Sequence, residues 1–300
     1  MQRGTIEVAA PVDLQATLES GQSYLWWRED GRDFEAGTAG DAGPYLTTTR
    51  ATGEPAAVRV RQHGDGIEWA STVDAGPVLR RRLGLDDDLP AIRATAPDDR
   101  LIDRAYDEYW GMRIVRDPPF PSLVSFICSA QMRVSRIHGM QQALREQFGE
   151  PVELGGETYH AYPTAERLAA ASESELRELK LGYRAPYVKR TAEMVAEGTD
   201  PADAAGRAYE DAREYLTQFV GVGEKVADCV LLFSLGYLEA VPLDTWIRTT
   251  IEEYYPECDR GNYAETSRAI RDRLGGEFAG YTQTYIFHYL RHAEDEPATA

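Results

Sequence analysis

The hydrophobic pattern of this chain changes its period once, and that change constrains the fold more than any other feature. Before residue 72, short apolar segments alternate with turns rich in Gly, Asp and Pro. Val58 and Val60 alternate with Arg59 and Arg61, the period-two pattern of an antiparallel strand with one solvated face. Beyond about residue 100, apolar residues recur at helical spacing. We therefore predict an α+β protein in which a small antiparallel sheet precedes a larger helical part.

The boundary is expected near Asp86, Asp87, Asp88 and Pro90, followed by a loop that reaches Asp99. This divides the chain into an N-terminal sheet domain (1–97), a helical domain (98–292) and a disordered tail (293–300). Strands are expected over 5–8, 24–28, 45–49, 58–62 and 67–71. Helices are expected over 101–112, 121–127, 134–148, 185–197, 208–219, 224–235, 245–254, 264–274 and 280–291, with a further helix opened by a capping box at Ser172 and Glu175.

Composition narrows the class of protein. The chain has 300 residues, of which 43% are hydrophobic, as in a globular protein. It has no apolar leader and no apolar run of membrane-spanning length, so we expect a cytoplasmic protein without a membrane partner. Three cysteines without a CxxC pair and five scattered histidines predict no metal and no other cofactor. We expect a monomer.

The charge of the chain bears on whether nucleic acid can be a partner. The formal net charge is −18, and only three of the 32 basic residues are lysines. Read alone, this composition counts against a DNA partner. Many carboxylates with few lysines also fit a halophilic surface, because at about 1 M salt the Debye length falls to roughly 3 Å and distant charges cease to matter. An ordinary acidic protein is the alternative.

Residues 216–229 read LTQFVGVGEKVADC and predict two helices joined by a short glycine turn. Gly221 and Gly223, which flank Val222, can adopt positive φ and allow a close approach. Backbone N–H groups at the start of the second helix are then free to bind a phosphate. Turns between helices often contain glycine, so the motif alone is weak.

Lys225 makes the motif more specific. It falls in the first turn of the expected helix, where the helix dipole disfavours a cation by about 0.3–1 kcal/mol. A nucleophilic amine benefits from this place, because the dipole favours its neutral form. A lysine that only contacts phosphate is an equally good interpretation of this segment.

Asp244 follows in the segment VPLDTW, at the expected N-cap of the next helix. Aspartate is a favoured N-cap and needs no further role there. A capping carboxylate that faces a cleft can also stabilise positive charge on a sugar, and the two roles are compatible.

Together these residues resemble the helix-hairpin-helix DNA glycosylase superfamily, most closely the 8-oxoguanine DNA glycosylase/lyase family. Four further segments match that family in order along nearly the whole chain: SGQSY at 20–24 with Trp26, SFICS at 125–129, LGYRA at 181–185, and Gln283 with Phe287. The resemblance implies base excision repair of double-stranded DNA that contains a damaged base. Lys225 would attack the flipped nucleoside as a Schiff-base nucleophile and lyase residue, and Asp244 would be the catalytic carboxylate.

The same resemblance assigns the base pocket. Phe287 and Cys229 would sandwich the base, Gln283 would meet its Watson–Crick edge, and the Gly21 carbonyl would accept the N7–H of 8-oxoguanine. Without the resemblance, Phe287 and Cys229 read as core residues and Gly21 as an ordinary turn glycine.

Arg136 and Arg184 match the arginines with which the family reads the cytosine opposite the lesion. The family's asparagine triplet is replaced here by Gln131, Met132 and Arg133, although Met132 retains the apolar character of an intercalating wedge.

Two further positions depart from the family. Trp246 stands where the family has a phosphate-binding histidine, and Val220 replaces the usual hairpin proline.

Two alternatives remain open from the sequence. A monofunctional alkylpurine DNA glycosylase shares the hairpin and the aspartate but lacks the lysine. A non-catalytic helix-hairpin-helix protein would bind DNA without turnover.

Overall fold

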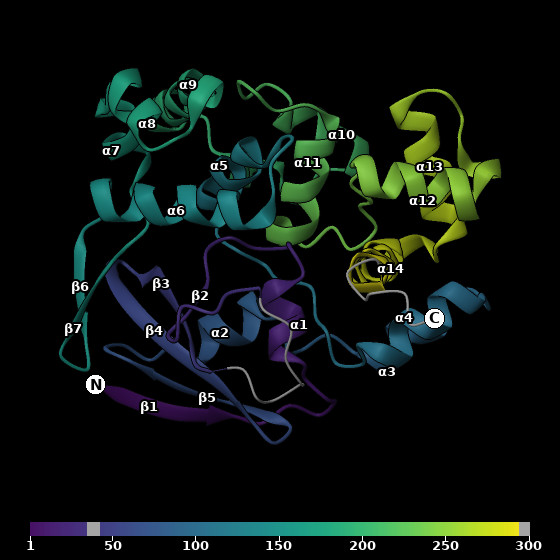
Figure 1. Ribbon diagram of the computed structural model, residues 1–300, viewed down its shortest axis with the longest axis horizontal. Helices are drawn as coiled ribbons and strands as arrows, with labels where there is room; N and C mark the ends of the chain where they lie inside the picture. The colour runs from purple at the N-terminus through teal and green to yellow at the C-terminus, as the bar shows by residue number, and fades with distance from the viewer. Residues whose placement is uncertain (35–42, 294–300) are drawn as a thin grey trace, which may run out of the picture.

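Figure 1 shows the computed structural model of the chain, which describes residues 1–34 and 43–293. Five strands form an antiparallel sheet in the order β1-β5-β4-β3-β2. Their bounds are β1 (Gln2–Ile6), β2 (Trp27–Arg28), β3 (Tyr45–Thr52), β4 (Glu54–His63) and β5 (Gly66–Ser71). In β4, Val58 and Val60 are buried whereas Arg59 and Arg61 are exposed, as the alternation predicts.

Three short helices accompany the sheet: α1 (Leu14–Glu19), α2 (Gly76–Arg82) and α3 (Leu89–Thr95). The loop expected up to Asp99 was wrong, because α3 occupies most of it. The Asp88 side chain accepts a hydrogen bond from the Ala91 amide as an N-cap, and Pro90 lies in the first helical turn. The acidic residue Asp88 and Pro90 thus open a helix rather than a loop.

The helical part surrounds a central pair, α5 (Pro119–Ser129) and α11 (Glu224–Val230), which pack against each other (Figure 1). The other helices are α4 (Arg100–Glu108), α6 (Val134–Phe148), α7 (Ala165–Ala170), α8 (Glu173–Glu178), α9 (Ala185–Ala196), α10 (Tyr209–Leu216), α12 (Thr245–Tyr254), α13 (Tyr263–Arg273) and α14 (Ala279–Ala293). The predicted bounds of α6 and α12 are confirmed, as is the capping box that opens α8.

Several elements of the second half were not expected, among them α7. A hairpin of β6 (Pro151–Leu154) and β7 (Glu157–His160) packs its Val152 and Leu154 against Leu46 and Ala57 of the main sheet. A five-residue π-helix (Leu231–Leu235) continues α11, in place of the regular helix expected to residue 235.

One buried hydrophobic cluster runs from the sheet into the helices and includes Ile6, Leu79, Phe126 and Ile286. In the described residues, no helix is both long and apolar enough to cross a bilayer. The expected tail over 293–300 lies outside the described residues, apart from Ala293 at the end of α14. The α+β class predicted from the sequence is confirmed.

Candidate active site

The hairpin predicted at 216–229 joins α10 to α11. Gly221 adopts φ +85°, and a Cβ there would lie 2.9 Å from Tyr187 on α9, so both its conformation and its packing favour glycine. Gly223 is the N-cap of α11 with an extended backbone, so the expectation of positive φ holds for Gly221 alone. Among the described residues, no side chain caps α11. Its first N–H groups and Val222 therefore form a turn that a phosphate could approach.

Lys225 lies in the first turn of α11 with its side chain half-buried. Its Nζ donates a hydrogen bond to Ser129 Oγ over 3.4 Å, at the end of the neighbouring α5. The same amine lies 5.9 Å from the centre of the Phe126 ring, also on α5. Packing between α5 and α11 thus directs the amine into the protein rather than into solvent.

Asp244 is the N-cap of α12, as predicted, and its carboxylate accepts a hydrogen bond from the Ile247 amide over 2.9 Å. Burial raises the pKa of Asp244. The Ile247 amide and the positive charge of Lys225 oppose that rise. The carboxylate therefore caps a helix and interacts electrostatically with the amine at the same time.

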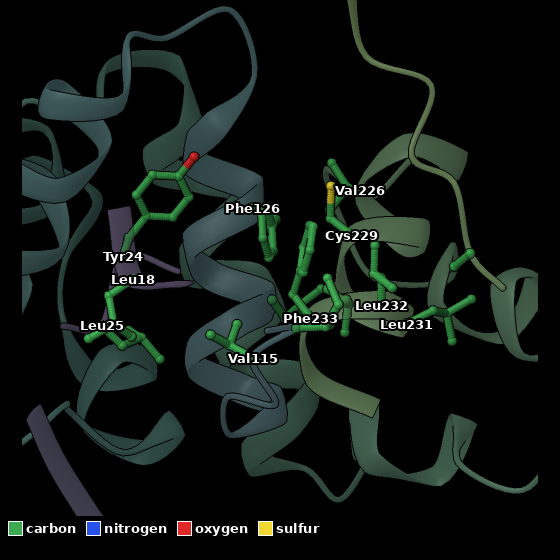
Figure 2. Packing of buried hydrophobic residues seen from close by; sticks show 14 of the residues in the cluster. Leu18, Tyr24, Leu25, Val115, Phe126, Val226, Cys229, Leu231, Leu232 and Phe233 are labelled. Carbon is green, nitrogen blue, oxygen red and sulfur yellow. The ribbon is translucent and has the colours of Figure 1, made fainter. Parts of the chain in front are cut away.

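Lys225 and Asp244 line one cavity, which we call the central pocket. Its volume is about 70 Å³, and its walls come from six segments of the chain: Ser20, Gly21, Gln22, Tyr24, Phe126, Val134, Lys225, Cys229, Phe233, Pro242, Asp244, Gln283, Thr284 and Phe287. Figure 2 shows Phe126 and Phe233 between Tyr24 and the Cys229 sulfur. The Phe126 ring stacks on Phe233 at 5.8 Å and meets Tyr24 edge-on at 5.9 Å, so one wall is aromatic.

The structure brings the four predicted base-binding residues to this pocket. Cys229 lies one turn beyond Lys225, and burial raises the pKa of its thiol to about 11. Gln283 is buried on α14, and its Oε1 accepts no hydrogen bond within the described part of the chain. Phe287 follows one turn later on α14. The pocket therefore combines apolar faces with one free carbonyl oxygen.

The fourth residue, Gly21, lies in a loop that buried polar side chains hold in place. Gln22 donates hydrogen bonds to the carbonyls of Thr17 and Arg113, while its Oε1 accepts one from the Val115 amide. Gly21 itself has φ +91°, a conformation that favours glycine. The loop thus fixes the backbone at Gly21 beside the pocket.

The residues predicted to read the opposite strand lie around the turn between α5 and α6. Arg184 is buried and donates a hydrogen bond to the Ala130 carbonyl, next to Gln131, which adopts φ +55°. The Nε of Arg184 is buried and has no hydrogen-bond acceptor among the described residues. Met132 is half-buried against the core, and Arg136 is exposed on the first turns of α6.

Several residues of the site were not singled out from the sequence, among them Tyr24, Ser129 and Arg291. Tyr24 and Ser129 lie in segments that match the family, but nothing in their spacing shows that one forms a pocket wall and the other contacts Lys225. Arg291 lies on α14 one turn after Phe287, and its guanidinium carbon is 5.9 Å from the centre of the Phe287 ring. Only the fold brings these side chains to the pocket.

Comparison with known proteins agrees with this geometry. Residues 124–275 match the family model described as HhH-GPD superfamily base excision DNA repair protein. A probable N-glycosylase/DNA lyase of Methanothermobacter thermautotrophicus is 29% identical, with 94% of each chain covered. An N-glycosylase/DNA lyase of Saccharomyces cerevisiae is 30% identical over 87% of this chain and 73% of its own length.

Solved structures give the same result. The apo form of the Clostridium acetobutylicum 8-oxoguanine glycosylase/lyase has a TM-score of 0.83 to this chain at 26% identity, covering 96% of both chains. The same enzyme bound to double-stranded DNA with cytosine opposite 8-oxoguanine has a TM-score of 0.82 at 25% identity, covering 98% of this chain and 99% of the other. The chain therefore belongs to the helix-hairpin-helix (HhH-GPD) superfamily of base excision DNA repair proteins and is a DNA glycosylase/lyase.

Proposed function

We propose that this glycosylase/lyase excises 8-oxoguanine paired with cytosine and then cleaves the strand through a Schiff base on Lys225. The observation that carries the proposal is the meeting of Lys225 and Asp244 in one pocket with Cys229, Gln283 and Phe287. Solved structures that are similar over nearly the whole chain are those of an 8-oxoguanine glycosylase/lyase, and this similarity supports 8-oxoguanine as the substrate. Cytosine as the opposite base is supported only by the similarity to the Clostridium acetobutylicum enzyme, which was solved with cytosine opposite 8-oxoguanine.

The chemistry follows from the two charged residues. Lys225 first loses the proton of its ammonium group, and the neutral amine then attacks C1′ of the flipped nucleoside. The base leaves with the electrons of the glycosidic bond and takes up a proton. The Asp244 carboxylate stabilises the positive charge that develops on the sugar. The sugar ring opens to an imine on Lys225. Loss of a C2′ proton then expels the 3′ phosphate by β-elimination.

Recognition of the base uses the remaining pocket residues. The free Oε1 of Gln283 accepts a hydrogen bond from the Watson–Crick edge of the purine, while Phe287 and Cys229 hold its two faces. The Gly21 carbonyl accepts the N7–H that 8-oxoguanine has and guanine lacks. Guanine would leave that buried acceptor unpaired, which is a strong basis for discrimination.

Contacts outside the pocket hold the duplex. The hairpin turn at Gly221, Val222 and Gly223 binds a phosphate through the backbone N–H groups of its two glycines, because the Val222 amide already donates to the Phe219 carbonyl. The turn between α5 and α6 faces the strand opposite the lesion. Its Gln131, Met132 and Arg136, together with Arg184, fill the space left by the flipped base and contact the orphan cytosine.

Borohydride trapping tests the nucleophile. The chain contains three lysines, Lys180, Lys189 and Lys225, so few amines compete. A labelled duplex with 8-oxoguanine opposite cytosine, incubated in high KCl, should give a covalent adduct with wild type and none with Lys225→Gln. Lys189→Gln is the matched control, because that amine instead binds the carbonyls of Ala169 and Ala171, and it should be trapped normally.

Other outcomes identify other functions. Release of free base without an adduct in wild type would favour a monofunctional glycosylase. Binding without an adduct or base release would favour a non-catalytic DNA-binding protein. An adduct that persists in Lys225→Gln would contradict the assignment of the nucleophile.

A further inference from the structure

The guanidinium group of Arg291 lies beside the central pocket, and the proposed chemistry does not use it. It lies four residues after Phe287 on α14, so the two side chains share a helix face. A Cβ added to Gly21 would lie 3.5 Å from Arg291 Nη1 and 3.8 Å from the Phe287 ring. The guanidinium is therefore next to two residues that line the pocket, at the end of α14.

This guanidinium has no anionic partner in the described part of the chain. Its Nη1 is shielded from solvent and donates no hydrogen bond there. By contrast, Arg271 and Arg273 on α13 form ion pairs with Glu239 and Asp99. A buried donor without an acceptor costs folding free energy, which a ligand that supplies the acceptor would recover.

The charges around Arg291 indicate what such a ligand must be. Lys225 is a second cation at the pocket, and the single carboxylate among the pocket's walls, Asp244, already caps α12. Burial raises the pKa of Asp244 and the charge of Arg291 opposes that rise, so the charge of Arg291 reaches the reaction centre. A guanidinium binds the oxygens of a phosphate with charge-assisted hydrogen bonds, often two at once. A nucleotide that enters this pocket carries a phosphate on each side of its sugar.

We infer that Arg291 binds a phosphate that flanks the flipped nucleotide and thereby holds the sugar in place between Lys225 and Asp244. This inference rests on the proposed function. Exposed Trp246, two residues after Asp244, has only an indole N–H to offer a phosphate, so Arg291 supplies the cationic contact beside Gly21 and Phe287.

The test measures binding without chemistry. The probe is a duplex with a tetrahydrofuran abasic analogue, which has no base to excise, titrated with wild type, Arg291→Gln and Arg291→Lys over a range of KCl. Arg291→Gln should bind about tenfold more weakly. Its slope of log K against log salt should be smaller by about 0.9, the value for one phosphate contact. Arg291→Lys should retain the slope because it retains the charge.

A second probe locates the contact. Neutral methylphosphonates replace, one at a time, the phosphates on either side of the analogue. One of them should weaken wild type but have no further effect on Arg291→Gln. Arg268→Gln is the control for loss of one positive charge, because Arg268 on α13 is exposed and already paired with Glu210 on α10, and it should keep the wild-type slope.

The two possible failures are distinct. If wild type fails to prefer the abasic analogue over undamaged duplex, the proposed function itself is wrong. If that preference holds but Arg291→Gln keeps both the slope and the methylphosphonate penalties, the inference is wrong and Arg291 only packs against Phe287.

Discussion

Asp244 combines two tasks at one position, and its surroundings make them separable by mutation. Its carboxylate caps α12 through the Ile247 amide, and it also faces Lys225 across the central pocket. Asparagine caps a helix about as well as aspartate, whereas alanine does not. The asparagine variant therefore retains the helix cap but loses the negative charge.

We expect Asp244→Asn to slow single-turnover excision about 100-fold or more, with little change in the free energy of unfolding. Asp244→Ala should slow excision similarly and also lose about 1 kcal/mol of stability in urea unfolding. Burial raises the pKa of Asp244, so its carboxylate becomes protonated at a higher pH than an ordinary carboxyl group. As the pH is lowered, the rate of wild-type excision should therefore begin to fall above the usual range for a carboxyl group. A wild-type rate in Asp244→Asn would show that the carboxylate serves only as a cap.

At the scale of elements, α11 is held by a buried carboxylate that the sequence did not reveal. Asp228 accepts hydrogen bonds of 2.7 Å from Tyr209 on α10 and from Tyr263 on α13. The Tyr263 hydroxyl also accepts a hydrogen bond from the Leu243 amide, next to Asp244. The helix that carries Lys225 is thus connected through Asp228 and Tyr263 to the segment that carries Asp244.

Burial raises the pKa of Asp228 to about 6, so the folded protein binds a proton between about pH 4 and 6 that the unfolded chain has released. The contribution of this proton to the free energy of unfolding is fully present below about pH 4 and is lost as the pH rises through about 6. Asp228→Asn should remove this dependence from melting temperatures measured between pH 4 and 7. Asp211→Asn, an exposed control on α10, should retain it. Equal pH dependence in wild type and Asp228→Asn would refute this account.

Elements with strong local signals were predictable, and those defined by tertiary contacts were not. The Ser172 capping box and the alternation in β4 specify their structure locally. The hairpin of β6 and β7 also had a local signal, because Gly155 and Gly156 form a two-residue turn of positive φ. Its strands are too short, however, to show a clear alternation of apolar and polar residues. In the site, the approach of Ser129 to Lys225 depends on how α5 packs on α11, and no sequence spacing encodes it.

On the scale of the whole molecule, the net charge of −18 opposes both compaction and the approach of DNA. Buried ion pairs such as Arg82 with Asp117, 2.5 Å apart, compensate locally but leave the overall repulsion in place. Salt screens that repulsion between separated surface charges and acts far less on the buried pairs.

We therefore expect the melting temperature to rise from 0.1 M to molar KCl, and excision of 8-oxoguanine to persist in molar KCl. An ordinary basic repair enzyme should dissociate from DNA over the same range. Thermal melts and single-turnover assays in a KCl series measure both effects. A lower melting temperature and complete loss of excision in molar KCl would contradict a halophilic adaptation.

The small volume of the central pocket has a consequence for equilibrium populations. At about 70 Å³ it is well below the roughly 300 Å³ at which pockets for small ligands begin, so a purine requires a more open arrangement of its walls. If the open conformer is a fraction f of the molecules, the apparent dissociation constant for the flipped base is the intrinsic one divided by f. Because the same factor applies to intact and damaged nucleotides alike, the closed pocket weakens the binding of every flipped base and leaves the choice between them to the contacts inside it.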